Sequence, residues 1–229
     1  MLKRILAALR RPKQKPSSTL SANGERVDIN LTTSPNTEAM DMYEVSHYKR
    51  YLFAKQYVVD GMVCGDFACG SGYGSVLLGD IAQQVIGIDI SQNVIDEVTS
   101  RYLHLTNIKF FCKDLRNINF IEEFDLITSF ETIEHVAPND AVQMLKNFSR
   151  GLKQDGTLIF STPYLQKRSN VAIKLGFHLT FNIDEAMVAS WLDEAGLFCE
   201  KYYYQNYITH EVTQELVAKD FIICIAKKK

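Results

Sequence analysis

The chain has 229 residues, of which 46% are apolar and 23% charged, and its net charge is −2. This composition is typical of a globular protein with one large domain or two small ones, and no apolar run approaches the roughly 18 residues of a membrane-spanning helix. Five cysteines without regular spacing argue against a disulfide framework or a zinc finger and favour a reducing cytoplasm.

The chain begins with a basic segment. Residues 1–19 contain six cations and no acid, and their apolar residues recur at helical spacing: Leu2, Ile5, Leu6 and Leu9. This pattern predicts an amphipathic helix that makes weak contact with an anionic membrane surface through residues 1–15. The alternative is a frayed, solvated terminus. The remainder of the chain is acidic, which argues against a nucleic-acid partner.

A polar stretch follows and then a helix. Residues 12–37 are rich in Ser, Thr, Asn and Pro, as in a loop, and apolar residues return at helical spacing from Glu38 to about Val59. We expect residues 20–60 to form a lid and helix over a ligand site. Residues 61–229 are expected to form one catalytic domain without a second substrate domain.

From Met62 onward, short apolar runs alternate with amphipathic segments. The expected strands are "MVCGDFA", "QQVIGIDI", "IKFFCKD", "FDLITSF" and "GTLIFSTP", and helices are expected between them, one with Ser91 as its N-cap. Such alternation predicts a parallel sheet with helices on both faces. The chain closes with "FCEKYYYQNY" and "DFIICIAKK", two strands without an intervening helix, which predict an antiparallel pair.

Three glycines lie two residues apart in "DFACGSGYG", where the first strand meets the first helix. Missing side chains let a ligand approach the backbone there, and a carboxylate at the end of the second strand, Asp89, suits ribose hydroxyls. Tight packing of helix on strand is the alternative. The G-x-G-x-G spacing with Asp66 upstream differs from the dinucleotide pattern, and Asp114 ends the third strand where it suits an adenine amino group. Together these features suggest S-adenosylmethionine.

The motifs "VCGDFACGSGYGSVLL", "VIGIDIS", "CKDL", "FDLITSFETIEHV" and "GTLIFSTP" resemble, in order, those of class I S-adenosylmethionine-dependent methyltransferases. The resemblance is to the branch that contains ubiquinone-pathway O-methyltransferases and bacterial glycan-cluster methyltransferases. It implies an α/β, Rossmann-like three-layer sandwich. The sheet would have seven mostly parallel strands, with the last strand antiparallel.

The resemblance also implies a set of cofactor contacts. Gly70 and Gly72 would face the methionine part, Asp89 the ribose, and Ile90 the adenine. The full implied set is Arg50, Asp66, Ala68, Gly70, Gly72, Asp89, Ile90, Asp114, Leu115 and Phe130. In this set, Asp114 and Leu115 would cover the adenine edge. Arg50 would pair with the cofactor carboxylate or, alternatively, be a solvated helix residue. Ala68 stands where many members have glycine, and little harm is expected from it.

Acidic and imidazole side chains follow the fourth strand. Glu131, Glu134 and His135 stand at i, i+3 and i+4, so in a helical turn all three would point the same way. With His178, they resemble the metal site of small-RNA 2′-O-methyltransferases, which implies Mg or Mn and catalytic roles for His135, Glu131 and His178. Two alternatives remain open, a metal-free general base and a structural role.

The function expected from these features is methyl transfer to an oxygen, with nitrogen as the alternative acceptor atom. A sugar or surface-glycan precursor is the first candidate acceptor, and a quinone or other small-molecule precursor is the second. A nicotinamide-dependent oxidoreductase and a catalytically silent cofactor-binding subunit are alternatives from other classes. The protein is expected in the cytoplasm, including the inner face of the membrane. The sequence does not indicate an oligomeric state.

Overall fold

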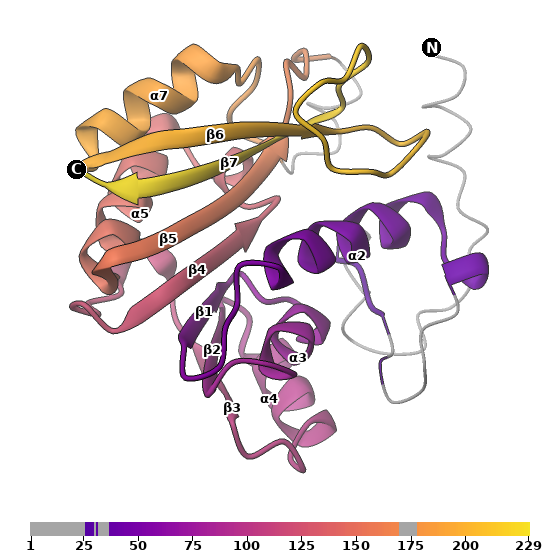
Figure 1. Ribbon diagram of the computed structural model, residues 1–229, viewed down its shortest axis with the longest axis vertical. Coiled ribbons are helices and arrows are strands. Elements are labelled where there is room, and N and C mark those ends of the chain that lie inside the picture. Colours follow the sequence, from indigo (N-terminus) through magenta and orange to yellow (C-terminus); the bar gives the residue numbers. More distant parts are fainter. Residues whose placement is uncertain (1–25, 30, 32–36, 170–177) are drawn as a thin grey trace.

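The computed structural model describes residues 26–29, 31, 37–169 and 178–229, which form a three-layer α/β sandwich (Figure 1). The middle layer is a seven-stranded sheet of order β3-β2-β1-β4-β5-β7-β6. Its strands are β1 (Val63–Phe67), β2 (Gln84–Asp89), β3 (Ile108–Cys112), β4 (Phe124–Phe130), β5 (Leu152–Pro163), β6 (Leu197–Gln205) and β7 (Phe221–Lys228). The fold class predicted from the sequence is confirmed.

The last strand has the predicted direction. Strands β1 to β5 are parallel, whereas β7 lies between β5 and β6 and is antiparallel to both. All residues from Phe221 to Ala226 are buried. A strand covered on both faces requires such a continuous apolar run, which explains why its sequence does not alternate.

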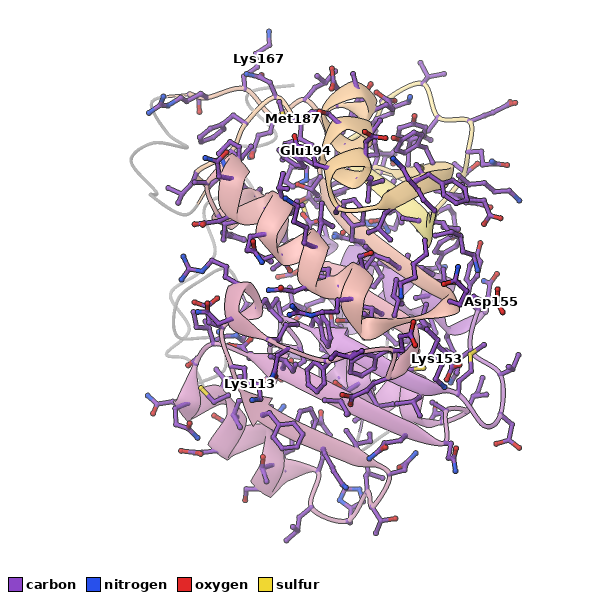
Figure 2. The ribbon with its side chains drawn as sticks, turned by 90° about the vertical axis from the view of Figure 1, so that its left-hand side faces the viewer. Lys113, Lys153, Asp155, Lys167, Met187 and Glu194 are labelled. Carbon is purple, nitrogen blue, oxygen red and sulfur yellow. The ribbon has the colours of Figure 1, made fainter. Side chains whose placement is uncertain are left out.

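Helices cover both faces of the sheet. On one face lie α2 (Met42–Lys55), α3 (Tyr73–Gly79) and α4 (Gln92–Arg101), and on the other α5 (Pro138–Gly151) and α7 (Glu185–Glu194). Figure 2 shows the second face, with α5 and α7 in front of the sheet and Met187 and Glu194 on α7. Each crossover helix returns the chain, so the carboxyl ends of the parallel strands meet at one edge.

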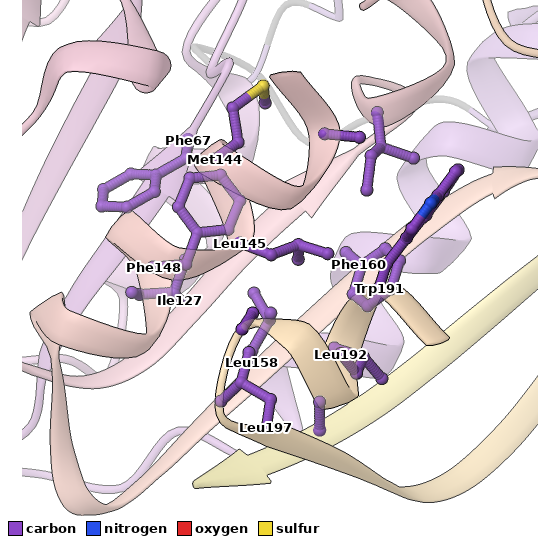
Figure 3. Packing of buried hydrophobic residues seen from close by; sticks show 14 of the residues in the cluster. Phe67, Ile127, Met144, Leu145, Phe148, Leu158, Phe160, Trp191, Leu192 and Leu197 are labelled. Carbon is purple, nitrogen blue, oxygen red and sulfur yellow. The ribbon is translucent and has the colours of Figure 1, made fainter. Parts of the chain in front are cut away.

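The main core lies between α5, α7 and the sheet. Phe67, Phe148 and Trp191 pack there with Leu158, all almost fully buried (Figure 3). Burial of each side chain of this size stabilises the fold by about 1.5–3 kcal/mol. A second cluster lies under α2 and α3. Two filled cores hold β1 and β4 rigidly in the middle of the sheet, where the sequence places the site.

One of the two predicted helix starts agrees with the structure. The helix expected from Glu38 to about Val59 is α2, which begins only at Met42 and ends at Lys55; Asp41 caps it, with its carboxylate bonded to the Glu44 backbone and Glu44 bonded back. Ser91 lies at the N-cap of α4 as predicted, but its side chain makes no capping bond. Its N–H instead donates to Asp89 Oδ1 at 2.9 Å. The turn therefore supports the strand-end carboxylate.

Some predicted segments fall outside the described residues. Residues 1–19 lie wholly outside them, and the expected lid, residues 20–60, is described at residues 26–29, 31 and 37–60. Within the described ranges, no helix has the length and apolar character needed to cross a bilayer.

Candidate functional site

The glycine bend lies at the carboxyl end of β1, where the strand order switches between β2 and β4. Open α/β sheets bind ligands at such switch points. Ala68, Gly70 and Gly72 have φ angles of 64°, 52° and 76°. Glycine adopts this left-handed region freely, whereas alanine loses about 1–2 kcal/mol there. The backbone of Ala68 is therefore strained, so alanine in place of glycine has an energetic cost that was not expected from the sequence.

Asp66, in the strand β1 that leads into this bend, holds the bend in place. It is fully buried, its Oδ1 accepts hydrogen bonds from the Tyr51 hydroxyl at 2.7 Å and from Thr128 at 3.1 Å, and its Oδ2 accepts one from Ser75 at 2.6 Å. Burial raises the pKa of this carboxyl, and the three hydroxyls oppose that rise. These bonds join α2, α3 and β4, so Asp66 positions the bend, and its expected contact with the cofactor stays a prediction.

Asp89, at the tip of β2, is bound to the bend. Its Oδ2 accepts from the Gly70 N–H at 3.1 Å and its Oδ1 accepts from the Ser91 N–H. The carboxylate is only 6% exposed, while the neighbouring Ile90 is 67% exposed. Each carboxylate oxygen has two lone pairs, so two backbone donors leave acceptor capacity for a ligand. The arrangement places an acceptor and an apolar platform beside the glycines.

The other residues expected near the adenine have different environments. Asp114 follows β3, and Arg116 Nη2 binds its carboxylate at 2.6 Å, which lowers the pKa of Asp114. The Leu115 side chain is buried in the main core. Phe130 packs edge-on against Tyr51, with 4.8 Å between ring centroids. The side chains of Leu115 and Phe130 pack in the interior, and contact of these two residues with the cofactor stays a prediction.

Arg50 is fully buried on α2, which contradicts the alternative that it is a solvated helix residue. Its Nη1 lies 2.6 Å from Glu131 Oε1 and 3.1 Å from Ser161 Oγ, and its Cζ lies 4.3 Å from the Phe221 ring centroid. Among the described residues, nothing bonds its buried Nη2. A buried, unpaired guanidinium N–H is costly, so this atom fits an incoming carboxylate.

Glu131 does not join the residues that follow it. It has a φ of 50° and precedes a short 3-10 turn, η4 (Ile133–His135), so the assumed helical spacing does not apply. Its carboxylate binds Arg50 and accepts from Ser161 Oγ at 2.7 Å. Glu131 therefore holds Arg50 and lies outside the convergent group of possible metal ligands among the described residues, while its expected catalytic role stays a prediction.

Glu134, His135 and His178 do converge. One ligand atom from each lies within 4.8 Å of the others. Glu134 is 1% exposed, and its Oε2 accepts from Thr162 at 3.0 Å, whereas no described group bonds its Oε1. Burial and the nearby Glu131 carboxylate raise the pKa of Glu134. A buried carboxylate oxygen beside two imidazoles is a donor set that suits a divalent cation.

The loop that carries His178 is docked on this turn. The N–H groups of Leu179 and Thr180 both donate to the Glu134 carbonyl. His178 Nδ1 contacts Gln166 Oε1, which is only an acceptor, so Nδ1 carries the proton and Nε2 the lone pair. Burial and the adjacent His135 lower the pKa of His178 to about 4. The imidazole is therefore neutral at pH 7, the form in which histidine binds a metal ion.

The sequence did not single out a strap of residues 26–29 beside the bend. Ser71 donates to the Val27 carbonyl at 2.8 Å, and Arg101 binds Asp28 at 2.6 Å. Arg26 Nη2 lies 3.7 Å from Asp89 Oδ1, and a Cβ on Gly70 would lie 3.5 Å from the Arg26 side chain. These contacts join segments distant in the chain, so no local pattern indicated them.

Comparison with known proteins agrees with this geometry. Residues 65–156 match the family described as "Methyltransferase domain". The chain is 32% identical over 101 residues to a probable S-adenosylmethionine-dependent methyltransferase of Mycolicibacterium smegmatis, covering 42% of this chain and 35% of that protein. It is 30% identical over 152 residues to the ubiquinone biosynthesis O-methyltransferase of Coxiella burnetii, covering 66% of this chain and 64% of that protein.

Solved structures show the same fold. An S-adenosylmethionine-dependent methyltransferase from Clostridium acetobutylicum superposes with a TM-score of 0.62 at 17% identity, covering 83% of this chain and 93% of that one. The PH0226 protein from Pyrococcus horikoshii gives a TM-score of 0.65 at 21% identity, covering 84% and 94%. The chain spans about one third to two thirds of the length of the curated relatives it matches.

Proposed function

The chain is a member of the class I S-adenosylmethionine-dependent methyltransferases, and from this premise we propose that it transfers a methyl group from that cofactor to an oxygen atom. The observation that carries the proposal is the strand-tip carboxylate Asp89, bonded to the glycine bend. The ubiquinone and malonyl-acyl-carrier-protein relatives, which are named O-methyltransferases, support oxygen as the acceptor atom.

Three residues would hold the cofactor. Asp89 would accept hydrogen bonds from the ribose hydroxyls, Ile90 would lie against the adenine, and Arg50 Nη2 would donate to the cofactor carboxylate. The cofactor, when bound, supplies the methyl group and its own thioether leaving group. The protein's remaining task is to align the acceptor and remove its proton.

We further propose that Glu134, His135 and His178 hold a divalent cation beside the cofactor site. Bound there, it would lower the pKa of an acceptor hydroxyl. Two imidazoles and one carboxylate suit zinc, iron or manganese better than magnesium, which prefers oxygen ligands. The contact of His178 Nδ1 with Gln166 Oε1 would orient this imidazole for the task.

The acceptor is proposed to be a hydroxyl-bearing sugar or surface-glycan precursor, with a quinone precursor as the second candidate. Residues 163–182 contain three large aromatic side chains, Tyr164, Phe177 and Phe181, so the composition of this segment does not separate the two candidates, whereas the ubiquinone-pathway relatives favour the quinone. Contact of residues 1–15 with an anionic membrane, which both precursors suit, also stays a proposal.

The proposed reaction is tested with isotopically labelled S-adenosylmethionine and a panel of sugar-nucleotide, lipid-linked sugar and catechol-type quinone acceptors. Labelled product from either acceptor class supports methyl transfer. Binding of NAD instead of S-adenosylmethionine would favour an oxidoreductase. Binding of S-adenosylmethionine without turnover on any acceptor would favour a silent subunit.

Dependence on metal is expected in the same assay. Treatment with EDTA should remove at least nine tenths of the activity, and manganese or zinc should restore it more fully than magnesium, because the donor set contains two imidazoles. Activity that is indifferent to chelation would remove the metal and leave His178 as the proton acceptor.

The strap of residues 26–29 is proposed to form part of the lid over the cofactor. Replacing Arg26 with alanine is expected to weaken binding of S-adenosylhomocysteine about 3- to 10-fold, as expected for loss of one charge-assisted contact. The Lys55→Met variant removes a distant ion pair to Asp80 and should bind normally. Tighter binding by Arg26→Ala would mean that the strap competes with the cofactor.

A further inference from the structure

Two cysteines that belong neither to the glycine bend nor to the Glu134, His135 and His178 cluster lie in direct contact. Cys199 on β6 and Cys224 on β7 are 25 residues apart, yet their Sγ atoms are 3.0 Å apart. Cys224 is 1% exposed in the main core, and Cys199 is half-buried at its edge. The methyl-transfer site uses neither residue, so their proximity needs a separate account.

The strand register explains how the two thiols meet. Cys199 pairs with Ala226, and Cys224 pairs with Tyr202, so the cysteines are diagonal neighbours. The register shifts between Cys199 and Lys201, where β6 contains one extra residue. Such a bulge redirects the flanking side chains and increases the local twist. Here it accompanies the contact of the Cys199 thiol with the thiol on β7.

The two thiols differ in chemical character. Cys224 donates a hydrogen bond to Cys199 Sγ, and this bond lowers the pKa of the Cys199 thiol although burial opposes it. Burial and the same contact raise the pKa of Cys224. A lowered thiol pKa with partial exposure is the environment of a reactive cysteine. Cys199 is thus the nucleophile of the pair and Cys224 the resolving thiol.

We propose that Cys199 and Cys224 are a peroxide-sensitive dithiol that closes to a disulfide between β6 and β7. The Cys199 thiolate attacks a hydroperoxide oxygen, the O–O bond breaks, and a sulfenic acid forms with release of water or alcohol. The Cys224 sulfur then attacks the Cys199 sulfur and expels water. In sum, two thiols lose two electrons and two protons, and one hydrogen peroxide becomes two waters.

The bond would tie the edge strand to the interior of the sheet. β6 pairs only with β7 among the described strands, and its Tyr202 and Tyr204 hydroxyls bond to Glu185 at the start of α7. A disulfide of about 2.05 Å requires the sulfurs to approach by roughly 1 Å. Closing a loop of this length is expected to raise the melting temperature by about 5–10 °C.

The test uses the full, reduced chain exposed to equimolar hydrogen peroxide. Free thiols are then blocked with N-ethylmaleimide in denaturant and the protein is analysed by intact mass and non-reducing peptide mapping. We expect two of the five cysteines to escape alkylation, a peptide that joins Cys199 to Cys224, and full reversal by dithiothreitol. Cys112, also partly exposed, is the matched control, and Cys112→Ser should form the same bond.

Two variants test the separate roles of Cys199 and Cys224 in forming the disulfide. Cys199→Ser should form no disulfide, and Cys224→Ser should accumulate a sulfenic acid on Cys199 that dimedone traps. Alkylation of all five cysteines after peroxide, or a bond between any other pair, would overturn the proposal. Neither result would affect the proposed methyl transfer, which is measured separately.

Discussion

Replacing Gly74 with alanine is expected to lower the free energy of unfolding by about 3 kcal/mol, the upper range for overpacking a rigid site. Gly74 lies in α3, and a Cβ there would come within 2.1 Å of the Tyr51 ring. The ring cannot move aside easily, because its hydroxyl is bonded to the buried Asp66. Urea denaturation of the variant should show an earlier midpoint with an unchanged slope.

Gly151→Ala is the matched control, because Gly151 also lies in a helix, α5, but has room for a methyl group. Its Cβ would meet its nearest neighbours at 3.4 Å, an ordinary contact, and alanine favours the helix by about 1 kcal/mol. That variant should be as stable as the natural chain or more stable. Equal stability of the two variants would show that Tyr51 does not constrain Gly74.

Replacing Glu134 with glutamine is expected to reduce turnover by about 10²- to 10⁴-fold, the range for losing assistance to proton transfer, because the proposed cation would lose its carboxylate ligand and the acceptor hydroxyl would keep its proton. The amide preserves the shape and the bond from Thr162 but removes the charge of the unbonded Oε1. His178→Ala should have a similar effect. Both variants should bind S-adenosylhomocysteine with nearly natural affinity, because the cofactor residues are unchanged.

The control for these variants is His104→Ala, which removes an exposed imidazole outside the site. Its turnover should be unchanged. If Glu134→Gln and His178→Ala retain near-natural turnover on an identified acceptor, the cluster has a structural role only, and the catalytic assignment fails.

The sequence predicted the scaffold well because its signals are local. Strand and helix periods, the antiparallel closing pair, and the glycine bend with Asp89 about twenty residues later are each visible within short windows. The parallel alternation then places Asp89 beside Gly70 by topology alone, and the 3.1 Å bond between them follows.

The details of the site depend on contacts between residues that are too far apart in the sequence to form a local pattern. Asp66 is bonded to Tyr51 and Thr128, which precede and follow it by 15 and 62 residues. The error over Glu131 had a specific cause, since one positive φ angle turns it out of register with Glu134. Likewise, five irregularly spaced cysteines did not indicate that Cys199 and Cys224 are in contact, because the bulge in β6 that accompanies this contact has no distinct sequence signal.

The most direct test of the account is calorimetric titration of the purified full chain with S-adenosylhomocysteine, beside the Asp89→Ala variant. We expect one binding site per chain for the natural protein and at least 100-fold weaker binding for the variant, because both ribose hydroxyls lose their acceptor. No binding by the folded natural chain, or equal binding by both proteins, would contradict the assignment of the glycine bend and Asp89 as the cofactor site.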